Sequence, residues 1–221
     1  MRDARLAIEV DGHQIDNLFW TPEDGCGSSA LLLHPHPLYG GNMLDAVVSM
    51  IHRTLAENGF CTLRINFRGV GRQDSVFAGV GGAVEDALMA HASLVRATKH
   101  SQVGVLGYSF GASVALHVAA EYDVAFLVAL SPSYKIVEEV KESQDILPRI
   151  KCPVLLVHGS KDSVVPPSDS ELIASQIGSK DFTMEILEGV GHFYHESLDF
   201  VGRTLSEFLE RLHSKGTGRK S

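Results

Sequence analysis

Hydrophobic and polar residues alternate near the start of the chain, and further on short apolar runs alternate with longer amphipathic stretches. Residues 5–10 and 14–20 alternate around Asp11-Gly12-His13, a pattern that predicts a β-hairpin. Apolar runs bounded by turn residues predict buried strands at 30–33, 60–67, 103–106, 124–130, 154–157 and 182–187.

Apolar positions at helical spacing predict helices between these strands. One begins at the cap candidate Asn42, with Asp45 three residues later, and ends before Gly59. Further helices are predicted at 83–98, 112–120 and 168–177. A last helix buries Leu198, Val201, Leu205, Phe208 and Leu212.

This alternation of strand and helix predicts an α/β fold, a three-layer sandwich of a mostly parallel eight-stranded sheet with helices on both faces. We expect a single domain over residues 1–221, with a minimal insert at about 134–150 and a frayed tail at 216–221. The insert has room for one helix. In such sheets, ligands bind at the carboxyl ends of the strands.

The motif G-x-S-x-G follows the fifth predicted strand directly, as Gly107-Tyr108-Ser109-Phe110-Gly111. A helix of small residues follows, so Ser109 lies at a strand-to-helix corner, the context that makes this motif informative. Glycines two residues away on each side leave room for such a sharp turn. The helix start provides free N–H groups beside the serine. This pattern favours a nucleophilic serine over a buried serine in an ordinary turn.

A nucleophilic serine needs a base and a group that orients the base, and both follow later strands. Asp162 comes after the seventh predicted strand and His192 after the eighth. We expect His192 to take the proton of Ser109 and Asp162 to hold the imidazole in place. The alternative for Asp162 is a turn residue that caps Ser163 or Val164.

Three other residues compete for these roles. His195 lies one helical turn beyond His192 and is the alternative base. Asp169 and Asp181 are alternative carboxylates, although they are interpreted as a helix-start residue and a loop residue.

Four segments together resemble a known group of enzymes. They are H-P-H-P-L-Y-G-G-N-M at 34–43, R-I-N-F-R-G-V-G at 64–71, G-Y-S-F-G-A at 107–112 and G-V-G-H-F at 189–193. With the order Ser, Asp, His, they resemble the α/β-hydrolase superfamily, and within it small, lidless bacterial serine hydrolases related to dienelactone hydrolases. The resemblance covers about the whole chain and favours His192 over His195.

An oxyanion hole needs two N–H donors, and Phe110, directly after the nucleophile, is expected to supply one. The other is expected in the loop after the third strand, where Pro35 and Pro37 have no N–H and leave His36 or Leu38. The resemblance favours His36, which takes the usual place in the H-G-x loops of the superfamily.

His34 and His36 could instead bind a metal, but no clustered cysteine or carboxylate supports this, so we predict no metal and no cofactor. Arg68 follows the fourth strand, where it either braces loops or binds an acidic substrate, and bracing is the preferred interpretation.

The segment 134–150 is short and carries Glu138, Glu139, Lys141 and Glu142, which favour a solvated helix face. Large lids occur at this place in the superfamily. We therefore expect an open cleft lined by Tyr39, Phe110, Tyr134 and Phe193 that takes short acyl groups.

Composition adds limits on partners and location. The 221 residues carry 19 Lys and Arg against 27 Asp and Glu, a net charge of -8, which argues against nucleic acid as a partner. The charged start of the chain leads into no apolar signal segment, and no run has transmembrane length, so no membrane partner is expected. Cys26, Cys61 and Cys152 form an odd set without metal spacing, which fits a reducing cytoplasm. The protein is expected as a monomer or a homodimer.

The preferred prediction is a serine carboxylesterase that cleaves small esters through an acyl-enzyme on Ser109. A thioesterase, peptidase or acyltransferase would use the same residues, and only substrates distinguish them. A non-catalytic binding protein of this fold would be favoured by a missing triad member, and none is missing. Dienelactone hydrolysis is less favoured, since the resemblance implies a cysteine where this chain has Ser109.

Overall fold

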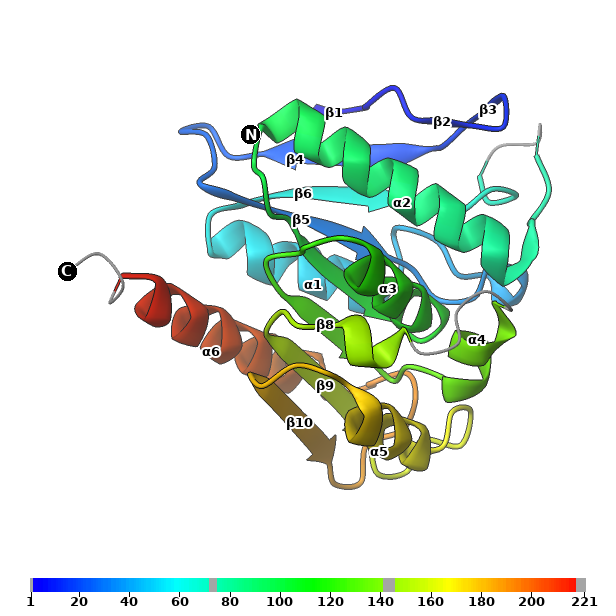
Figure 1. Cartoon of the computed structure of the whole chain (residues 1–221), viewed down its shortest axis with the longest axis vertical. Coiled ribbons are helices and arrows are strands. Elements are labelled where there is room, and N and C mark those ends of the chain that lie inside the picture. The colour runs from blue at the N-terminus through cyan, green and yellow to red at the C-terminus, as the bar shows by residue number, and fades with distance from the viewer. Residues whose placement is uncertain (1, 72–74, 141–145, 218–221) are drawn as a thin grey trace.

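The computed structural model describes residues 2–71, 75–140 and 146–217 (Figure 1). Its main sheet has eight strands in the order β1-β4-β6-β5-β7-β8-β9-β10. Their bounds are β1 Arg2–Ala4, β4 Asn17–Thr21, β5 Ser28–Leu33, β6 Phe60–Ile65, β7 Gly104–Tyr108, β8 Leu127–Leu130, β9 Val154–Gly159 and β10 Phe182–Leu187. β1 and β4 pair antiparallel, and all pairs from β6 to β10 are parallel.

Helices cover both faces of this sheet (Figure 1). α1 (Ala46–Glu57) and α6 (Leu198–Thr217) bury their apolar residues in one core. α2 (Gly79–Thr98), α3 (Phe110–Glu121) and α5 (Pro167–Gln176) contribute to the core on the other face. Successive side chains of a strand point to opposite faces, so Leu31 and Leu33 enter one core while Leu32 enters the other. The predicted three-layer α/β architecture is confirmed.

The outer strand of the sheet differs from the prediction. The predicted hairpin is a separate pair, β2 (Glu9–Val10) with β3 (His13–Gln14), and β1 takes the edge beside β4. The carboxamide of Asn17 accepts from the Leu6 N–H and donates to the Leu6 carbonyl, both at 2.9 Å. Leu6 is thus held by a side chain, and the Ile8 carbonyl accepts from the backbone N–H of Ile15 at 2.8 Å.

Several helix and strand limits are also corrected. α1 begins at Ala46, and its cap is Asp45, whose Oδ1 accepts from the Val47 N–H at 2.8 Å. Asn42 instead accepts from Leu44 N–H in the preceding turn. α2 begins four residues earlier than predicted, β8 begins at Leu127 rather than at 124, and α6 continues to Thr217.

The insert at 134–150 holds two short helices instead of one, α4 (Tyr134–Glu139) and the 3₁₀ helix η2 (Leu147–Arg149). Residues 141–145, including the predicted exposed residues Lys141 and Glu142, lie outside the described residues, as does the end of the predicted tail at 218–221.

Cys26 and Cys61 form a disulfide, with their Cα atoms 5.6 Å apart, and Cys152 is free. The three cysteines were expected as an odd set in a reducing cytoplasm, so this pair was not predicted. It forms because β5 and β6 start side by side, with Ser28 opposite Phe60, which brings Cys26 close to Cys61. Across the three described ranges, none of the helices has the length and apolar character required to span a membrane.

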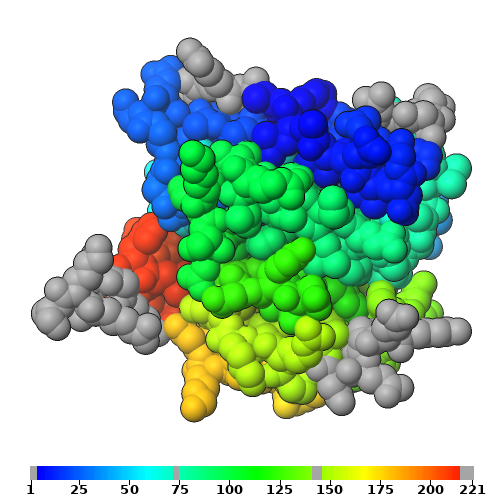
Figure 2. All heavy atoms as spheres, turned by 45° about the horizontal axis from the view of Figure 1, so that its top comes forward, coloured from blue at the N-terminus to red at the C-terminus, as the bar shows by residue number. Residues whose placement is uncertain are grey.

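Arg68 braces the polar loop after β6. Its guanidinium contacts Asp86 at 2.6 Å and Glu85 at 2.7 Å in α2, and Asp11 at 2.8 Å in the β2–β3 turn. Its backbone N–H also donates to Asp86. The N-terminal segment therefore lies against the chain around α2 (Figure 2). This confirms the bracing interpretation of Arg68.

Candidate active site

Ser109 lies at the corner between β7 and α3 in a conformation that few residues adopt, with φ 54° and ψ −117°. The corner is tight enough to need glycine on both sides. A Cβ on Gly107 would lie 2.1 Å from the Gly111 carbonyl oxygen, and one on Gly111 would lie 2.3 Å from the Leu33 carbonyl oxygen. These contacts are to backbone atoms, which cannot give way. The motif thus forms the sharp turn that the sequence predicts.

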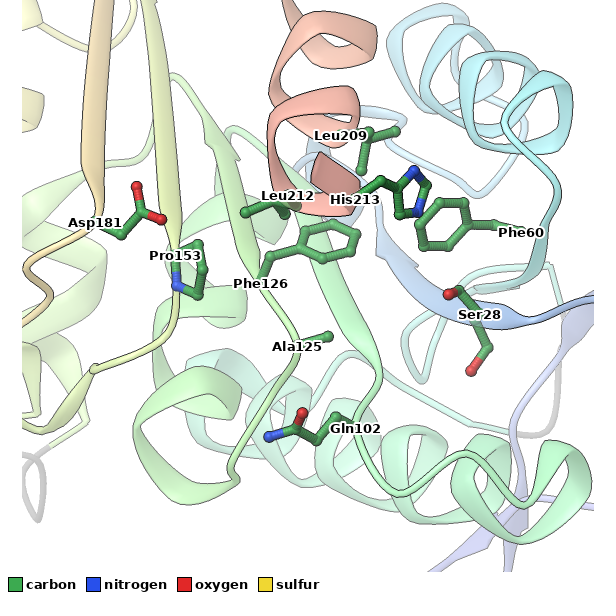
Figure 3. A pocket seen from close by; sticks show the side chains of 11 residues that line it. Ser28, Phe60, Gln102, Ala125, Phe126, Pro153, Asp181, Leu209, Leu212 and His213 are labelled. Atoms are coloured by element: carbon green, nitrogen blue, oxygen red, sulfur yellow. The ribbon is translucent and has the colours of Figure 1, made fainter. Parts of the chain in front are cut away.

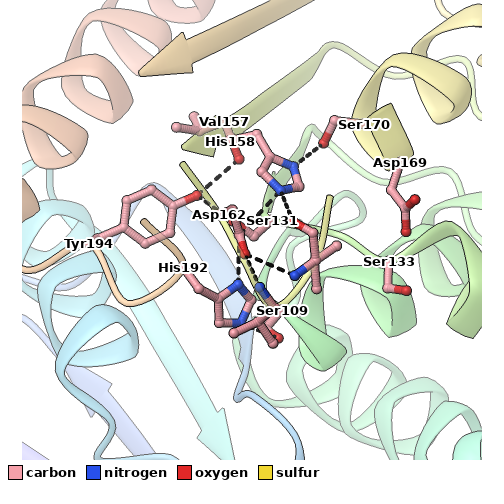
Figure 4. Close-up of polar contacts among 12 residues, drawn as sticks. Ser109, Ser131, Ser133, Val157, His158, Asp162, Asp169, Ser170, His192 and Tyr194 are labelled. Carbon is pink, nitrogen blue, oxygen red and sulfur yellow. Dashed lines mark hydrogen bonds and ion pairs between the residues drawn. The ribbon is translucent and has the colours of Figure 1, made fainter. Parts of the chain in front are cut away.

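The structure brings Ser109, His192 and Asp162 together (Figure 4). Nε2 of His192 lies 3.0 Å from Oγ of Ser109, and Nδ1 lies 2.7 Å from Oδ2 of Asp162. All three side chains come from loops at the carboxyl ends of β7, β9 and β10, and all are buried. A neutral imidazole that donates from Nδ1 to the carboxylate presents its Nε2 lone pair to the serine.

Asp162 receives donors on both carboxylate oxygens. Oδ1 accepts from the backbone N–H groups of Val164 at 2.9 Å and Val165 at 2.8 Å, so the residue also caps its own turn. Burial raises the pKa of Asp162, but the side-chain hydrogen bonds of His158 and His192 and these two N–H groups outweigh it. The pKa therefore lies well below its ordinary value, and the carboxylate stays ionised.

Two buried tyrosines hold the loop that carries His192. The Tyr108 hydroxyl, next to Ser109 in the motif, donates to the His192 carbonyl at 2.9 Å. The Tyr194 hydroxyl donates to the Val157 carbonyl at 3.1 Å and lies 2.9 Å from Oγ of Ser131. The backbone of the candidate base is thus attached to β7 and β9.

The loop after β5 contains the 3₁₀ helix η1 (Pro37–Tyr39) and lies beside the elbow. The His36 ring packs 4.7 Å from the Phe110 ring, and its Nδ1 accepts from the Leu38 N–H at 3.2 Å. The Leu38 N–H is therefore occupied. Among the described residues, the backbone N–H groups of His36 and Phe110 donate no hydrogen bond.

His34 is a structural residue in this loop. Its Nε2 accepts from the Phe67 N–H at 3.1 Å, and its Nδ1 lies 2.6 Å from the Pro35 carbonyl oxygen. Burial lowers the pKa of His34 to about 4, so the ring is neutral. Both ring nitrogens are used within the protein. Within the described ranges, no three or more His, Cys, Asp or Glu side chains are grouped so that they could hold a metal.

The predicted substrate-binding residues are placed differently from one another. Tyr39 is 88% exposed with its ring 4.9 Å from that of His36, and Phe193 is 58% exposed with its ring 5.4 Å from that of His192. Both therefore border the site. Tyr134 is half-buried, and its hydroxyl accepts from Gln176 in α5. No ring contact or hydrogen bond joins Tyr134 to the triad within the described residues.

The alternative residues lie elsewhere. Asp169 is in the first turn of α5 and accepts from the Tyr134 N–H at 2.9 Å, and Asp181 pairs with Arg211 before β10. His195 is exposed and packs against Phe193. The hollow in Figure 3, of about 390 Å³, lies at the opposite, amino ends of the strands, where Phe60, Phe126 and Leu209 line it.

Four residues around the candidate triad were not predicted from the sequence. Tyr108 and Tyr194 stand next to or two residues from members of the triad, but nothing in the sequence shows where their hydroxyls point. His158 and Ser170 form a further contact on the far side of Asp162. The only local signal is His158 in His158-Gly159-Ser160-Lys161-Asp162, four residues before the carboxylate.

The parallel sheet, the elbow at Ser109 and the chain of Ser109, His192 and Asp162 define an α/β hydrolase. The model of the dienelactone hydrolase family matches residues 39–202, and the chain belongs to this family.

Known proteins resemble it over most of their length. An uncharacterized protein of Rickettsia prowazekii (strain Madrid E) is 31% identical over 191 residues, which cover 84% of this chain and 79% of that protein. An α/β serine hydrolase homologue from Coxiella burnetii is 28% identical with a TM-score of 0.81, covering 93% of this chain and 96% of its own. A serine hydrolase without lid from Xanthomonas campestris is 27% identical with a TM-score of 0.79, covering 95% and 94%.

Proposed function

We propose that this hydrolase is a serine carboxylesterase that cleaves small esters through an acyl-enzyme on Ser109. The proposal depends most on the 3.0 Å contact between Oγ of Ser109 and Nε2 of His192, whose Nδ1 meets an ionised carboxylate. Serine is a poor nucleophile at neutral pH unless a base takes its proton, and this geometry supplies the base.

In the acylation step, Oγ of Ser109 attacks the ester carbonyl carbon while its proton moves to Nε2 of His192. The carbonyl oxygen becomes an oxyanion, which the free N–H groups of Phe110 and His36 stabilise. When the intermediate collapses, the bond to the alcohol oxygen breaks and the alcohol takes the proton from Nε2. Asp162 stabilises the imidazolium that exists between these two transfers.

In the deacylation step, water gives a proton to Nε2 and attacks the acyl carbon. The second intermediate expels Oγ of Ser109, which recovers the proton, and the carboxylic acid leaves. Apart from the ester and the water, every group in both steps is supplied by this chain. The proposed reaction therefore requires no metal and no cofactor.

The acyl chain is proposed to be short, about two to six carbons. A fully buried methylene stabilises binding by about 0.8 kcal/mol, so a covered tunnel would gain affinity with every added carbon. Tyr39 and Phe193 are 88% and 58% exposed, which favours an open rim instead. The similar Xanthomonas protein is described as having no lid.

A labelling experiment tests the proposal directly. A fluorophosphonate probe should modify Ser109, as mapped by mass spectrometry. Ser109→Ala should not be labelled, and its turnover of a short p-nitrophenyl ester should be lower than that of the wild type by a factor of at least about 10⁴. A variant that keeps a tenth of the activity would exclude Ser109 as the nucleophile. Inactivation by EDTA that a divalent metal reverses would contradict the metal-free mechanism.

Substrate assays separate the alternatives that share this site. Efficiency on p-nitrophenyl esters should peak at short acyl chains, and a maximum at about twelve carbons or more would favour a lipase or a long-chain thioesterase. Faster cleavage of the matching thioester or anilide would favour a thioesterase or a peptidase. Preferred transfer to an added alcohol would favour an acyltransferase. No binding of any of these substrates and no labelling would favour a non-catalytic protein.

The proposed partner is the small ester alone, without nucleic acid or membrane, in a monomer or a homodimer. The proposed cytoplasmic location and the Cys26–Cys61 disulfide are in conflict, because disulfides are rare in the cytosol. Counting free thiols in protein that is alkylated at cell lysis decides between them. A free thiol at Cys26 and at Cys61 agrees with the cytoplasm, and a free thiol at Cys152 alone does not.

A further inference from the structure

A second histidine contacts the carboxylate of Asp162 on the side away from the rest of the triad (Figure 4). His158 is part of β9, and its side chain is fully buried. Its Nε2 lies 3.2 Å from Oδ2 of Asp162 and 3.0 Å from the Val165 carbonyl oxygen. Its Nδ1 lies 2.7 Å from Oγ of Ser170 in α5.

These contacts determine which nitrogen of His158 carries the proton. A carbonyl oxygen and an ionised carboxylate oxygen only accept hydrogen bonds, so Nε2 must be protonated to face both of them. In the neutral ring Nδ1 is then an acceptor, and the Ser170 hydroxyl can donate to it. A ring protonated on Nδ1 alone would place its Nε2 lone pair against two oxygen atoms in a site without solvent.

The result is a nearly symmetrical arrangement around one oxygen atom. Oδ2 of Asp162 lies 2.7 Å from Nδ1 of His192 and 3.2 Å from Nε2 of His158, and each ring has a serine hydroxyl on its other nitrogen. Ser170 is 0% exposed, whereas Ser109 is 8% exposed at the elbow. His158 and Ser170 therefore cannot reach a substrate and can act on the reaction only through Asp162.

We propose that His158, whose Nε2–H faces the Val165 carbonyl and Asp162 and whose Nδ1 accepts from Ser170, is a positioning residue that orients the Asp162 carboxylate and limits its basicity. This inference rests on the proposed function of the triad. The groups that face His158 are Asp162, Ser170 and the Val165 carbonyl, and His192 lies across Oδ2. A donor on Oδ2 offsets part of the negative charge that the catalytic imidazolium would otherwise feel.

The tautomer can be measured without any activity assay. In protein labelled with ¹⁵N-histidine, the spectrum of His158 should show a protonated Nε2 and an unprotonated Nδ1, with the Nε2 proton protected from exchange. A spectrum with the proton on Nδ1 would overturn the proposal. The Ser170→Ala variant removes the donor to Nδ1 and should weaken this preference while leaving the His158 ring in place.

Kinetics should separate positioning from simple support of the fold. His158→Leu removes the donor, and kcat should fall about ten- to a hundredfold, the equivalent of one hydrogen bond to a charged group, with KM changed less than about twofold. Asp162 then attracts the imidazolium more strongly, so the acid limb of kcat/KM should move to higher pH by about half a unit or more. His158→Gln keeps an N–H donor at the same reach and should recover most of kcat.

His91→Leu is the matched control for His158→Leu, because His91 is also buried but lies in α2 and stacks on Tyr122, away from the triad. It should change stability without moving kcat or the acid limb. If His158→Leu lowers only stability, as the control does, His158 has no positioning role and the proposal fails. Active-site titration of the wild type keeps the two ideas apart: if the wild type is never acylated at Ser109, the proposed function fails, and the NMR result still decides the tautomer.

Discussion

Asp162→Asn replaces one oxygen of the carboxylate by an NH₂ group and removes its charge. The backbone N–H groups of Val164 and Val165 point at Oδ1 at 2.9 and 2.8 Å, so the amide oxygen of the variant must take that place. The NH₂ group then occupies the position of Oδ2 and faces the ring nitrogens of His192 and His158.

This exchange reverses the polarity of the contact with His192. The NH₂ group donates, so Nδ1 of His192 must become the acceptor and the ring proton moves to Nε2. Nε2 lies 3.0 Å from Oγ of Ser109 and can then no longer accept the serine proton. Holding the base in the wrong tautomer lowers kcat by about 10⁴ in a Ser-His-Asp protease, close to 5.4 kcal/mol in the activation free energy.

The assay is steady-state hydrolysis of a short p-nitrophenyl ester, with fluorophosphonate labelling to count competent sites. Asp169→Asn is the matched control, because it makes the same chemical change on a carboxylate in the first turn of α5 that accepts from the Tyr134 N–H. Its kcat should stay within about threefold of the wild type, the effect of a lost hydrogen bond remote from the chemistry. Asp162→Asn with more than a tenth of the wild-type kcat would refute the tautomer argument.

Three further outcomes are expected. Because the pKa of Asp162 is lowered in the folded state, its carboxylate stabilises the fold at pH values above the unfolded pKa of 3.8, and this contribution is lost as the pH falls through the folded pKa. Asp162→Asn has no such carboxylate, so its free energy of unfolding should fall less steeply on acidification than that of the wild type. Arg68→Met leaves the buried Asp86 without its cation and should lower the free energy of unfolding in urea by about 3–5 kcal/mol. Reducing the Cys26–Cys61 bond, which closes a separation of 35 residues, should lower stability by up to about 4 kcal/mol without changing kcat, as thermal unfolding and ester assays on the same sample would show.

The approach of Ser109, Asp162 and His192 could be predicted from the sequence because the topology of the sheet brings the ends of their strands together. Ser109, Asp162 and His192 each follow a strand, and the carboxyl ends of β7, β9 and β10 meet at one edge of the sheet. Gly107 could be interpreted for a similar reason, since a Cβ there would meet Gly111 within the corner itself. A Cβ on Gly111 would meet Leu33 of the neighbouring strand β5, so that part of the need for glycine comes from the fold.

The start of α1 could not be predicted in this way. Asn42 and Asp45 are both good caps, and propensity does not choose between them. In the structure, residues 42–45 form a separate turn, in which the Asp45 N–H donates to the Asn42 carbonyl at 3.0 Å, and Asp45 then caps the helix. Asn66, after β6, also contacts this turn, since its Oδ1 accepts from the Met43 N–H at 2.8 Å. A contact from 23 residues away leaves no local trace in the sequence.

Contacts between residues far apart in the sequence also decide which side chains hold the residues that would perform the reaction, and these are harder to predict than the reacting residues themselves. A nucleophile, its base and its carboxylate must be particular residue types, so their chemistry is visible in the sequence once the strands are placed. The groups around them only have to donate a hydrogen bond from the right place, and a tyrosine hydroxyl, a backbone N–H or an imidazole can each do so. Tyr108 and His158 are such donors, to the His192 carbonyl and toward Asp162. Their identity follows from which side chain the packing brings within reach, and for that the coordinates of the whole sheet are needed.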